Sequence, residues 1–178
     1  GQAFFEDVPS EDTRTAYRQL VKRRAEGTPV AYLVGYREFF SLTFEVTPDV
    51  LIPRPETEQL VVRTLDLAKE ASVELIADVG TGSGILAVCC AKHLPQSRVT
   101  AIDTSAPALA VAAKNAVRHN VADRITFVES DLFANVPEPR QFDLILSNPP
   151  YVSTEEMAEL DPKVRNFEPH LALDGGGQ

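Results

Sequence analysis

Apolar and polar positions in the first third of the chain predict a helix, a β-hairpin and a second helix. Residues 12–26 carry apolar positions at helical spacing and stop at Gly27, which is typical of a helix end. Residues 39–52 are rich in Phe, Leu, Val and Thr, with Pro48-Asp49 in the middle, and this composition predicts a hairpin. The apolar face of the first helix is expected to comprise Ala16, Leu20 and Val21.

The second helix is expected to follow Pro53-Arg54-Pro55, because proline is favoured near the first helical position. Its buried face should comprise Leu60, Val61, Thr64, Leu65 and Ala68.

From residue 74 onward, short apolar strands alternate with helices. Strands are expected at residues 74–79, 98–103, 125–128 and 142–147, with helices at 85–93 and after Ser105. This alternation predicts an α/β fold, a mostly parallel sheet with helices on both faces. The apolar face of the helix after Ser105 is expected to comprise Leu109, Ala112, Ala113, Ala116 and Val117.

The sequence after the fourth strand contains no further strand–helix pair. It is rich in proline and ends in Gly175-Gly176-Gly177-Gln178. A four-stranded parallel sheet leaves an edge that proteins usually cover. We therefore expect a core that is truncated after the fourth strand.

Composition is ordinary for a globular domain, with 178 residues of which 44% are hydrophobic. No apolar run is long enough to span a bilayer, and the N-terminal residues lack a signal-peptide pattern. The two cysteines, Cys89 and Cys90, are adjacent and unsuited to a mutual disulfide, so we expect a cytoplasmic protein. Three scattered histidines show no metal-ligand spacing, and no metal site is expected.

The formal net charge of −9 disfavours stable binding to nucleic acid. The chain has 17 basic and 26 acidic residues, and its one basic cluster, Lys22-Arg23-Arg24, resembles a solvated helix end. Neither a nucleic-acid partner nor a membrane is expected.

A glycine-rich loop, Asp78-Val79-Gly80-Thr81-Gly82-Ser83-Gly84, joins the first strand of the alternating region to its helix. Glycines let a ligand approach the main chain, and the helix start supplies free N–H groups. The glycines stand at the first, third and fifth positions, whereas dinucleotide-binding loops have them at the first, third and sixth. With the preceding acid, this spacing resembles an S-adenosylmethionine loop. A tight turn without ligand is the alternative.

Two acids follow the next strands. Asp103 ends the second strand, where a carboxylate can accept hydrogen bonds from both ribose hydroxyls. Ser105 is available to cap the next helix, which leaves Asp103 for this role. Asp131 follows the third strand, a position expected beside adenine, with Leu132 packed on the ring; a simple turn acid is an equally good interpretation.

The tetrad Asn148-Pro149-Pro150-Tyr151 ends the fourth strand. Its prolines end the strand ladder and leave carbonyls without local N–H partners. The Asn148 side-chain oxygen and the Pro149 carbonyl can accept hydrogen bonds from an NH₂ group, and Tyr151 can stack on a planar amide or base. Methyl transfer from a sulfonium would then need positioning and exclusion of water rather than a metal.

Segments outside the core motifs indicate which family of methyltransferases the chain resembles. Asn-Pro-Pro-Tyr is typical of methyltransferases that act on adenine, guanine or glutamine nitrogens. The segments 35–40 (GYREFF), 51–58 (LIPRPETE) and 167–169 (FEP) resemble the HemK or PrmC family of protein-(glutamine-N5) methyltransferases.

This resemblance implies a Rossmann-like class I methyltransferase core, with S-adenosylmethionine as cofactor and S-adenosylhomocysteine as product. The implied reaction methylates the glutamine of the Gly-Gly-Gln motif in peptide chain release factors. The implied cofactor contacts are Gly80, Thr81, Gly82, Ser83, Gly84, Asp103, Asp131, Leu132 and Asn148. The implied substrate contacts are Asn148, Pro149, Pro150 and Tyr151, with Asn148, Pro149 and Tyr151 as catalytic residues. The segment Arg54 to Glu58 is expected to close over the site.

The same resemblance divides the chain into two parts. Residues 1–35 would be the remnant of an N-terminal helical substrate-docking domain plus a linker. Residues 36–178 would be the methyltransferase catalytic domain without its C-terminal strands. The terminal Gly176-Gly177-Gln178 matches the substrate motif, which we interpret as coincidence.

Three alternatives remain open at this point. The substrate glutamine could belong to a ribosomal protein. The enzyme could instead methylate adenine or guanine in nucleic acid, with a flipped base stacked on Tyr151. Finally, the chain could hold the cofactor, or simply fold, without turnover.

Overall fold

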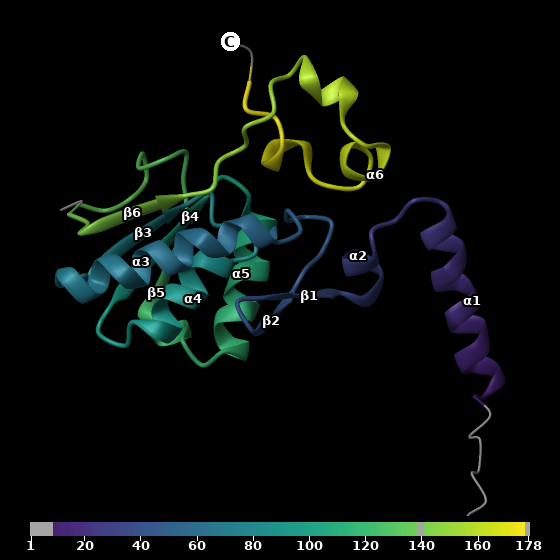
Figure 1. Cartoon of the computed structure of the whole chain (residues 1–178), viewed down its shortest axis with the longest axis horizontal. Coiled ribbons are helices and arrows are strands. Elements are labelled where there is room, and N and C mark those ends of the chain that lie inside the picture. Colours follow the sequence, from purple (N-terminus) through teal and green to yellow (C-terminus); the bar gives the residue numbers. More distant parts are fainter. Residues whose placement is uncertain (1–8, 139–140, 177–178) are drawn as a thin grey trace, which may run out of the picture.

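The computed structural model describes residues 9–138 and 141–176 (Figure 1). Helices and strands follow one another in the order α1 (Glu11–Ala25), α2 (Val30–Val34), β1 (Tyr36–Phe39), β2 (Leu42–Glu45), α3 (Glu58–Glu70), β3 (Leu75–Val79), α4 (Ile85–His93), β4 (Arg98–Asp103), α5 (Ala106–Arg118), β5 (Ile125–Glu129), β6 (Leu144–Ser147) and α6 (Pro162–Arg165). Short 3₁₀ helices are η1 (Pro55–Thr57), η2 (Ala122–Arg124), η3 (Glu156–Glu159) and η4 (His170–Ala172). Within this part of the chain, no helix is both long and apolar enough to cross a bilayer.

Four parallel strands form the central sheet in the order β5-β4-β3-β6. The chain runs outward from β3 to β4 and β5, and then returns to the other side of β3 with β6. The strand order therefore reverses beside β3, and open α/β sheets bind ligands at the carboxyl ends of strands at such a point. The predicted four-strand parallel core is confirmed.

The three long helices of the core pack on one face of the sheet, so the prediction of helices on both faces is wrong for the described residues. A cluster on this face joins Val61 of α3 and residues 85–91 of α4 to strand residues such as Ile76 and Leu146. The opposite face, with Ala77 and Ile102, is covered by the loop that follows β5. This loop supplies Val136, Phe133 and Phe142.

The hairpin lies a few residues before its predicted place. β1 and β2 are antiparallel, with Phe39 paired to Leu42. The intervening Phe40 and Ser41 have φ angles of 48° and 59° and make a two-residue turn. Pro48-Asp49, predicted as its centre, lies in a separate turn after β2. Neither Phe40 nor Ser41 is a usual residue for positive φ, so the sequence carried no turn signal there.

Helix α1 confirms the first predicted helix but not its buried face. None of its residues is buried, and Leu20 and Val21 are 37% and 49% exposed. Figure 1 shows why, because α1 stands apart from the sheet and contacts α2. The amphipathic pattern is therefore present without a covering element among the described residues.

Helix α5 begins as predicted, since the Ser105 hydroxyl accepts a hydrogen bond from the Ala108 backbone N–H at 3.2 Å. Its buried face is rotated from the predicted one. Val117, predicted to be buried, is 66% exposed. The buried positions are Ala108, Leu109, Val111, Ala112, Asn115 and Ala116. The helix covers both the sheet and β2, which shifts its buried stripe.

The segment after the tetrad folds back over the carboxyl edge of the sheet (Figure 1). It contains η3, α6 and η4, and returns at Asp174, which forms a parallel bridge with Val152. The Gly175 N–H donates to the Val152 carbonyl at 2.8 Å. Met157 of the short η3 is buried in this segment. Gly177 and Gln178 of the terminal motif lie outside the described residues.

Candidate active site

A cleft of about 610 Å³ opens at the carboxyl ends of the strands, a size typical of small-molecule sites. Most of the predicted site residues line it, although they come from four separate parts of the chain. These residues are Gly80, Thr81, Gly82, Ser83, Asp103, Asp131, Leu132, Asn148, Pro149 and Pro150. Gly84 and Tyr151 do not belong to the lining.

The glycine loop is held by its own backbone and by β4. The N–H groups of Gly80 and Thr81 both donate to the Ile102 carbonyl at 2.9 Å. Gly82 has a φ of 55°, and a Cβ built there would meet no atom within 4 Å. By contrast, a Cβ on Gly84 would lie 2.9 Å from the Cβ of Ala112. Gly84 is therefore needed for packing against α5, and Gly82 exposes backbone to the cleft.

Asp78 lies beneath this loop with 1% of its surface exposed. Its Oδ2 accepts hydrogen bonds from the Thr81 hydroxyl at 2.6 Å and the Ala87 N–H at 3.1 Å. Its Oδ1 is buried without a described partner. Burial raises the pKa of Asp78 to about 6, although both hydrogen bonds act in the other direction. The Thr81 hydroxyl thus stabilises the loop from below through Asp78, and the main chain of the loop lines the cleft.

Asp103 connects the loop to the start of α5. Its Oδ2 accepts from the Gly82 N–H at 2.9 Å, and its Oδ1 accepts from the Ser105 N–H at 3.0 Å. A carboxylate has about four acceptor positions, so both oxygens can still accept from a ligand. The carboxylate is therefore held in place before any ligand arrives.

Leu132 has a φ of 47° and is 63% exposed at the cleft. A positive φ is unfavourable for leucine and is found where surrounding structure enforces it. Ser130 helps to hold this loop, since its hydroxyl accepts from the Asn135 N–H at 2.8 Å. Asp131 lines the cleft beside Leu132.

Asn148 follows β6 directly at the end of the cleft. The Ser147 hydroxyl donates to the Val79 carbonyl at 2.9 Å, which joins the end of β6 to the end of β3. The Asn148 side chain donates from Nδ2 to the Thr57 hydroxyl at 3.3 Å. Tyr151 is 77% exposed and is not one of the residues that line the cleft. The tetrad therefore contributes its first three residues to the wall.

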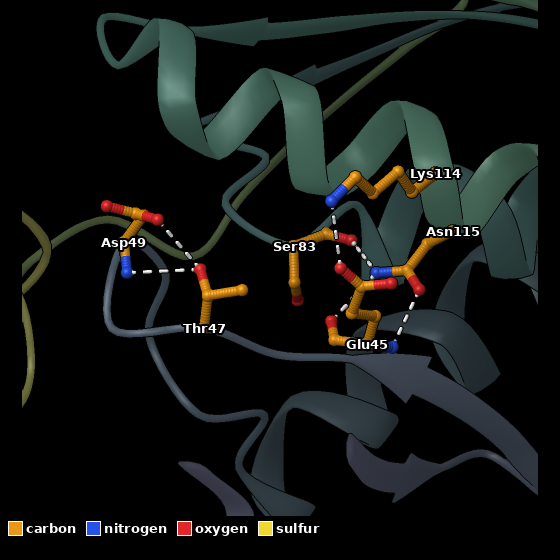
Figure 2. A network of polar contacts seen from close by, with 6 residues as sticks. All are labelled: Glu45, Thr47, Asp49, Ser83, Lys114 and Asn115. Atoms are coloured by element: carbon orange, nitrogen blue, oxygen red, sulfur yellow. Dashed lines mark hydrogen bonds and ion pairs between the residues drawn. The ribbon is translucent and has the colours of Figure 1, made fainter. Parts of the chain in front are cut away.

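A buried asparagine that the sequence analysis missed joins two walls of the cleft (Figure 2). Asn115 of α5 accepts from the Glu45 N–H at 2.7 Å and donates to the Glu45 carbonyl at 3.0 Å. Its Nδ2 also donates to the Ser83 carbonyl at 2.9 Å. The hairpin and the glycine loop are thus fixed to the same helix. Thr47 and Asp49, which continue from β2, bond to each other and bring Asp49 to the cleft.

The segment after Ile52 and the segment after the tetrad meet over the cleft. Arg54 and Glu168 form an ion pair with an N–O distance of 2.6 Å, and the Glu168 side chain is 2% exposed. The other Glu168 oxygen accepts from the Ile52 N–H at 3.1 Å. Arg54 and Pro169 both line the cleft.

The two cysteines do not line the cleft. Both are buried in α4, and burial raises the pKa of the Cys89 thiol to about 12. Within the described residues, no group of three or more His, Cys, Asp or Glu residues is placed to hold a metal ion.

Residues 56–164 match the family described as the Methyltransferase small domain, and residues 3–35 match the PrmC N-terminal domain. The chain belongs to the Methyltransferase small domain family. The first of these matches spans all four strands of the central sheet and the tetrad.

Curated relatives share the name release factor glutamine methyltransferase. The protein from Rhodopirellula baltica is 48% identical over 97% of this chain and 60% of its own length. The protein from Koribacter versatilis is 44% identical over 93% of this chain and 58% of its own length. The chain thus spans about 60% of the length of these relatives. The predicted resemblance to the HemK or PrmC family is confirmed.

Solved structures share the fold. The N-terminal domain of human METTL16 has a TM-score of 0.55 at 17% identity, over 85% of this chain and 68% of that one. Pyrococcus horikoshii TYW2 in complex with MeSAdo has a TM-score of 0.53 at 22% identity, over 75% and 47%. These matches confirm the predicted class I methyltransferase fold.

Proposed function

We propose that this chain is the core of an S-adenosylmethionine-dependent enzyme that methylates the glutamine side chain of the Gly-Gly-Gln motif in release factors. One observation supports the proposal most strongly. Asn148 and Pro149 line the same cleft as the glycine loop and Asp103. A substrate nitrogen bound by Asn148 and Pro149 would therefore lie next to a nucleoside bound by the glycine loop and Asp103.

The residues fit S-adenosylmethionine. The Gly82 backbone faces open space, and Asp103 keeps free acceptor positions for a ribose diol. Leu132 offers an exposed apolar surface for adenine. When bound, this cofactor supplies an electrophilic methyl group on a sulfonium, so that an N–CH₃ bond forms, the S–CH₃ bond breaks and one amide proton leaves to solvent.

The chain's part in the reaction is to position and desolvate the nitrogen. Asn148 Oδ1 and the Pro149 carbonyl would accept the two amide hydrogens of the substrate, which directs the nitrogen towards the methyl group. Tyr151, exposed beside the cleft, would pack on the planar amide as the substrate covers it.

The name shared by the curated relatives supports a release factor as the substrate. A net charge of −9 weighs against a nucleic acid. In this proposal, residues 1–35 belong to the substrate-docking part and residues 36–178 to the catalytic part.

Transfer of labelled methyl groups tests the substrate. The protein is incubated with methyl-labelled S-adenosylmethionine and either a release factor, its Gly-Gly-Glu variant, a ribosomal protein fraction or RNA. We expect label only in the release factor with glutamine, located by mass spectrometry. Label in RNA or in ribosomal protein, with none in the release factor, would overturn the proposed substrate.

Two variants separate binding from transfer. We expect Asp103→Asn to weaken S-adenosylmethionine binding roughly tenfold or more, because about 1.5–3 kcal/mol is lost with a charged hydrogen bond. We expect Asn148→Ala, which also removes one cofactor contact, to lose much less cofactor affinity than Asp103→Asn but to transfer methyl about 100-fold more slowly. Calorimetric titration and single-turnover rates give the two readouts. Wild-type transfer by the Asn148 variant would contradict the role of the tetrad.

A further inference from the structure

Thr57 occupies an unusual place for its residue type. It ends η1 at the start of α3 and is 4% exposed. A threonine at such a helix start normally caps the helix with its hydroxyl, but here the side chain makes no cap hydrogen bond. Its hydroxyl instead receives the Asn148 Nδ2 donor, from a residue 91 positions later.

In the structure, this contact turns Asn148 Nδ2 towards Thr57 and away from the cleft. An asparagine side chain carries an acceptor oxygen on one side and an NH₂ donor on the other. With Nδ2 directed at Thr57, Oδ1 remains for a ligand. The nitrogen of a substrate amide brings two hydrogens, so it requires an acceptor. If the Asn148 side chain were reversed, its own NH₂ group would face the NH₂ group of the substrate amide, and neither could accept a hydrogen bond.

We propose that Thr57 is a positioning residue for this reaction, because its hydroxyl accepts the Asn148 hydrogen bond and keeps Asn148 Oδ1 turned towards the substrate nitrogen. This inference rests on the proposed amide methylation. An apolar residue at position 57 would leave Nδ2 against a buried surface without a partner. The NH₂ group would then turn to the wet cleft, which is the unproductive orientation.

The chain holds Thr57 firmly enough for this role. Pro53 and Pro55 restrict the preceding backbone, and the Thr57 N–H donates to the Arg54 carbonyl at 3.1 Å. On the other side, Glu58 accepts from the Phe40 N–H at 2.8 Å. A side chain fixed at both ends of its segment can support the orientation of another to within the tolerance that transfer requires.

The first test detects the Asn148–Thr57 hydrogen bond by NMR and does not require catalysis. Side-chain NH₂ resonances are recorded by nitrogen–proton NMR, and the Asn148 pair is assigned by its loss in Asn148→Asp. We expect Thr57→Val to shift the Asn148 pair and Thr57→Ser to leave it near its original position. Thr64→Val is the matched control, since it removes another buried hydroxyl of α3 that bonds only within the helix to the Leu60 carbonyl. An unmoved Asn148 pair in Thr57→Val would overturn the inference.

The second test reads methyl transfer. We expect Thr57→Val to lower kcat by roughly 10- to 100-fold with an unchanged S-adenosylmethionine affinity and melting temperature. Thr57→Ser should restore kcat to within about threefold, and Thr64→Val should change it as little. An equal loss in the two valine variants, or no rescue by serine, would show that Thr57 has only a structural role.

The two proposals fail differently. If the wild-type protein transfers no methyl group to any amide, the proposed function fails, and the NMR result still decides whether Thr57 orients Asn148. If the wild-type protein is active and Thr57→Val is equally active, the inference about Thr57 fails alone.

Discussion

Asp78 is the residue whose chemistry differs most from that of an ordinary surface carboxylate. It is buried, one of its oxygens lacks a described partner, and burial raises its pKa to about 6. The charge of Asp103 adds to this shift. The other oxygen supports the glycine loop through Thr81 and Ala87. Loop geometry is thus obtained at a cost in stability whenever Asp78 is ionised.

The raised pKa of Asp78 predicts how the free energy of unfolding changes with pH. Because the folded pKa lies above the unfolded value of 3.8, the native state favours protonated Asp78. The stabilisation is complete below the unfolded pKa and is lost as pH rises through the folded one. We expect Asp78→Asn, which stays neutral, to gain up to about 3 kcal/mol relative to wild type between about pH 4 and pH 7.5. Urea unfolding at both pH values measures this difference.

The comparison between the two proteins cancels the titration of all other groups. Asp143→Asn is a suitable control, because Asp143 is an exposed acid whose pKa is lowered by the N–H groups of Leu75 and Glu74. Its variant should change little relative to wild type between about pH 4 and pH 7.5. It should change in the opposite direction only below that range, because the folded pKa of Asp143 lies below the unfolded value of 3.8. A constant difference between Asp78→Asn and wild type across this range would contradict the raised pKa.

Site residues with a sequence signature were predictable, and their partners were not. The glycine loop, Asp103 and the tetrad could be recognised from spacing, and most of them line one cleft. The role of Thr57 could not, because a threonine in a Pro-rich helix start is fully explained by local capping preferences. Its actual partner, Asn148, follows 91 residues later, at a distance that no periodicity covers.

At the scale of elements, α5 acts as the support of the cleft. Through Asn115 it holds the backbone of β2 and of the glycine loop together (Figure 2). The amide pairs with both backbone groups of Glu45, as a neighbouring strand would. Both amide hydrogens and the amide oxygen are hydrogen-bonded in a position with no solvent exposure, so the loss of this side chain leaves several buried groups unpaired.

We expect Asn115→Ala to lower the free energy of unfolding by about 2–4 kcal/mol, since three hydrogen bonds of about 1 kcal/mol disappear and their partners stay buried. Lys114→Ala is the control on the same helix. Lys114 is 63% exposed and pairs with the Glu45 carboxylate at 3.1 Å, so its loss should cost at most about 1 kcal/mol. Chemical denaturation compares the two variants. Equal effects would show that Asn115 is not the support.

Helix α5 also shows the limits of periodicity. Its location and its cap at Ser105 were predicted, since both depend on neighbouring residues. Its buried face was not, because Asn115 counts as polar in any pattern and Val117 as apolar. The hairpin was displaced for a similar reason, since Phe40 and Ser41 adopt positive φ without a typical turn sequence. Tertiary contacts override local preference in both cases.

For the whole molecule, the decisive feature is contact between segments far apart in the sequence. Phe167 packs on a cluster that contains Tyr32, Val50 and Ile52. The Tyr32 hydroxyl donates to the Val50 carbonyl at 2.6 Å, and burial, with the charge of Glu168, raises the pKa of Tyr32. Both ends of this contact carry family motifs, yet their proximity is visible only in the fold.

Glu168 is the centre of this contact, and its loss gives the last prediction. Removing the Glu168 carboxylate breaks the ion pair with Arg54, which is 28% exposed, and the bond from the Ile52 N–H, and together these losses cost about 2–4 kcal/mol. We therefore expect Glu168→Ala to lower the free energy of unfolding by that amount and to speed hydrogen exchange at the Ile52 N–H, which Glu168 accepts. Glu168→Gln should lose less than Glu168→Ala, because it keeps the shape and one of the two acceptor oxygens. The exposed Glu155→Ala should lose almost nothing. If hydrogen exchange at Ile52 were equally fast in Glu155→Ala, the segment would open independently of the ion pair. Apolar packing alone would then hold the two distant segments together.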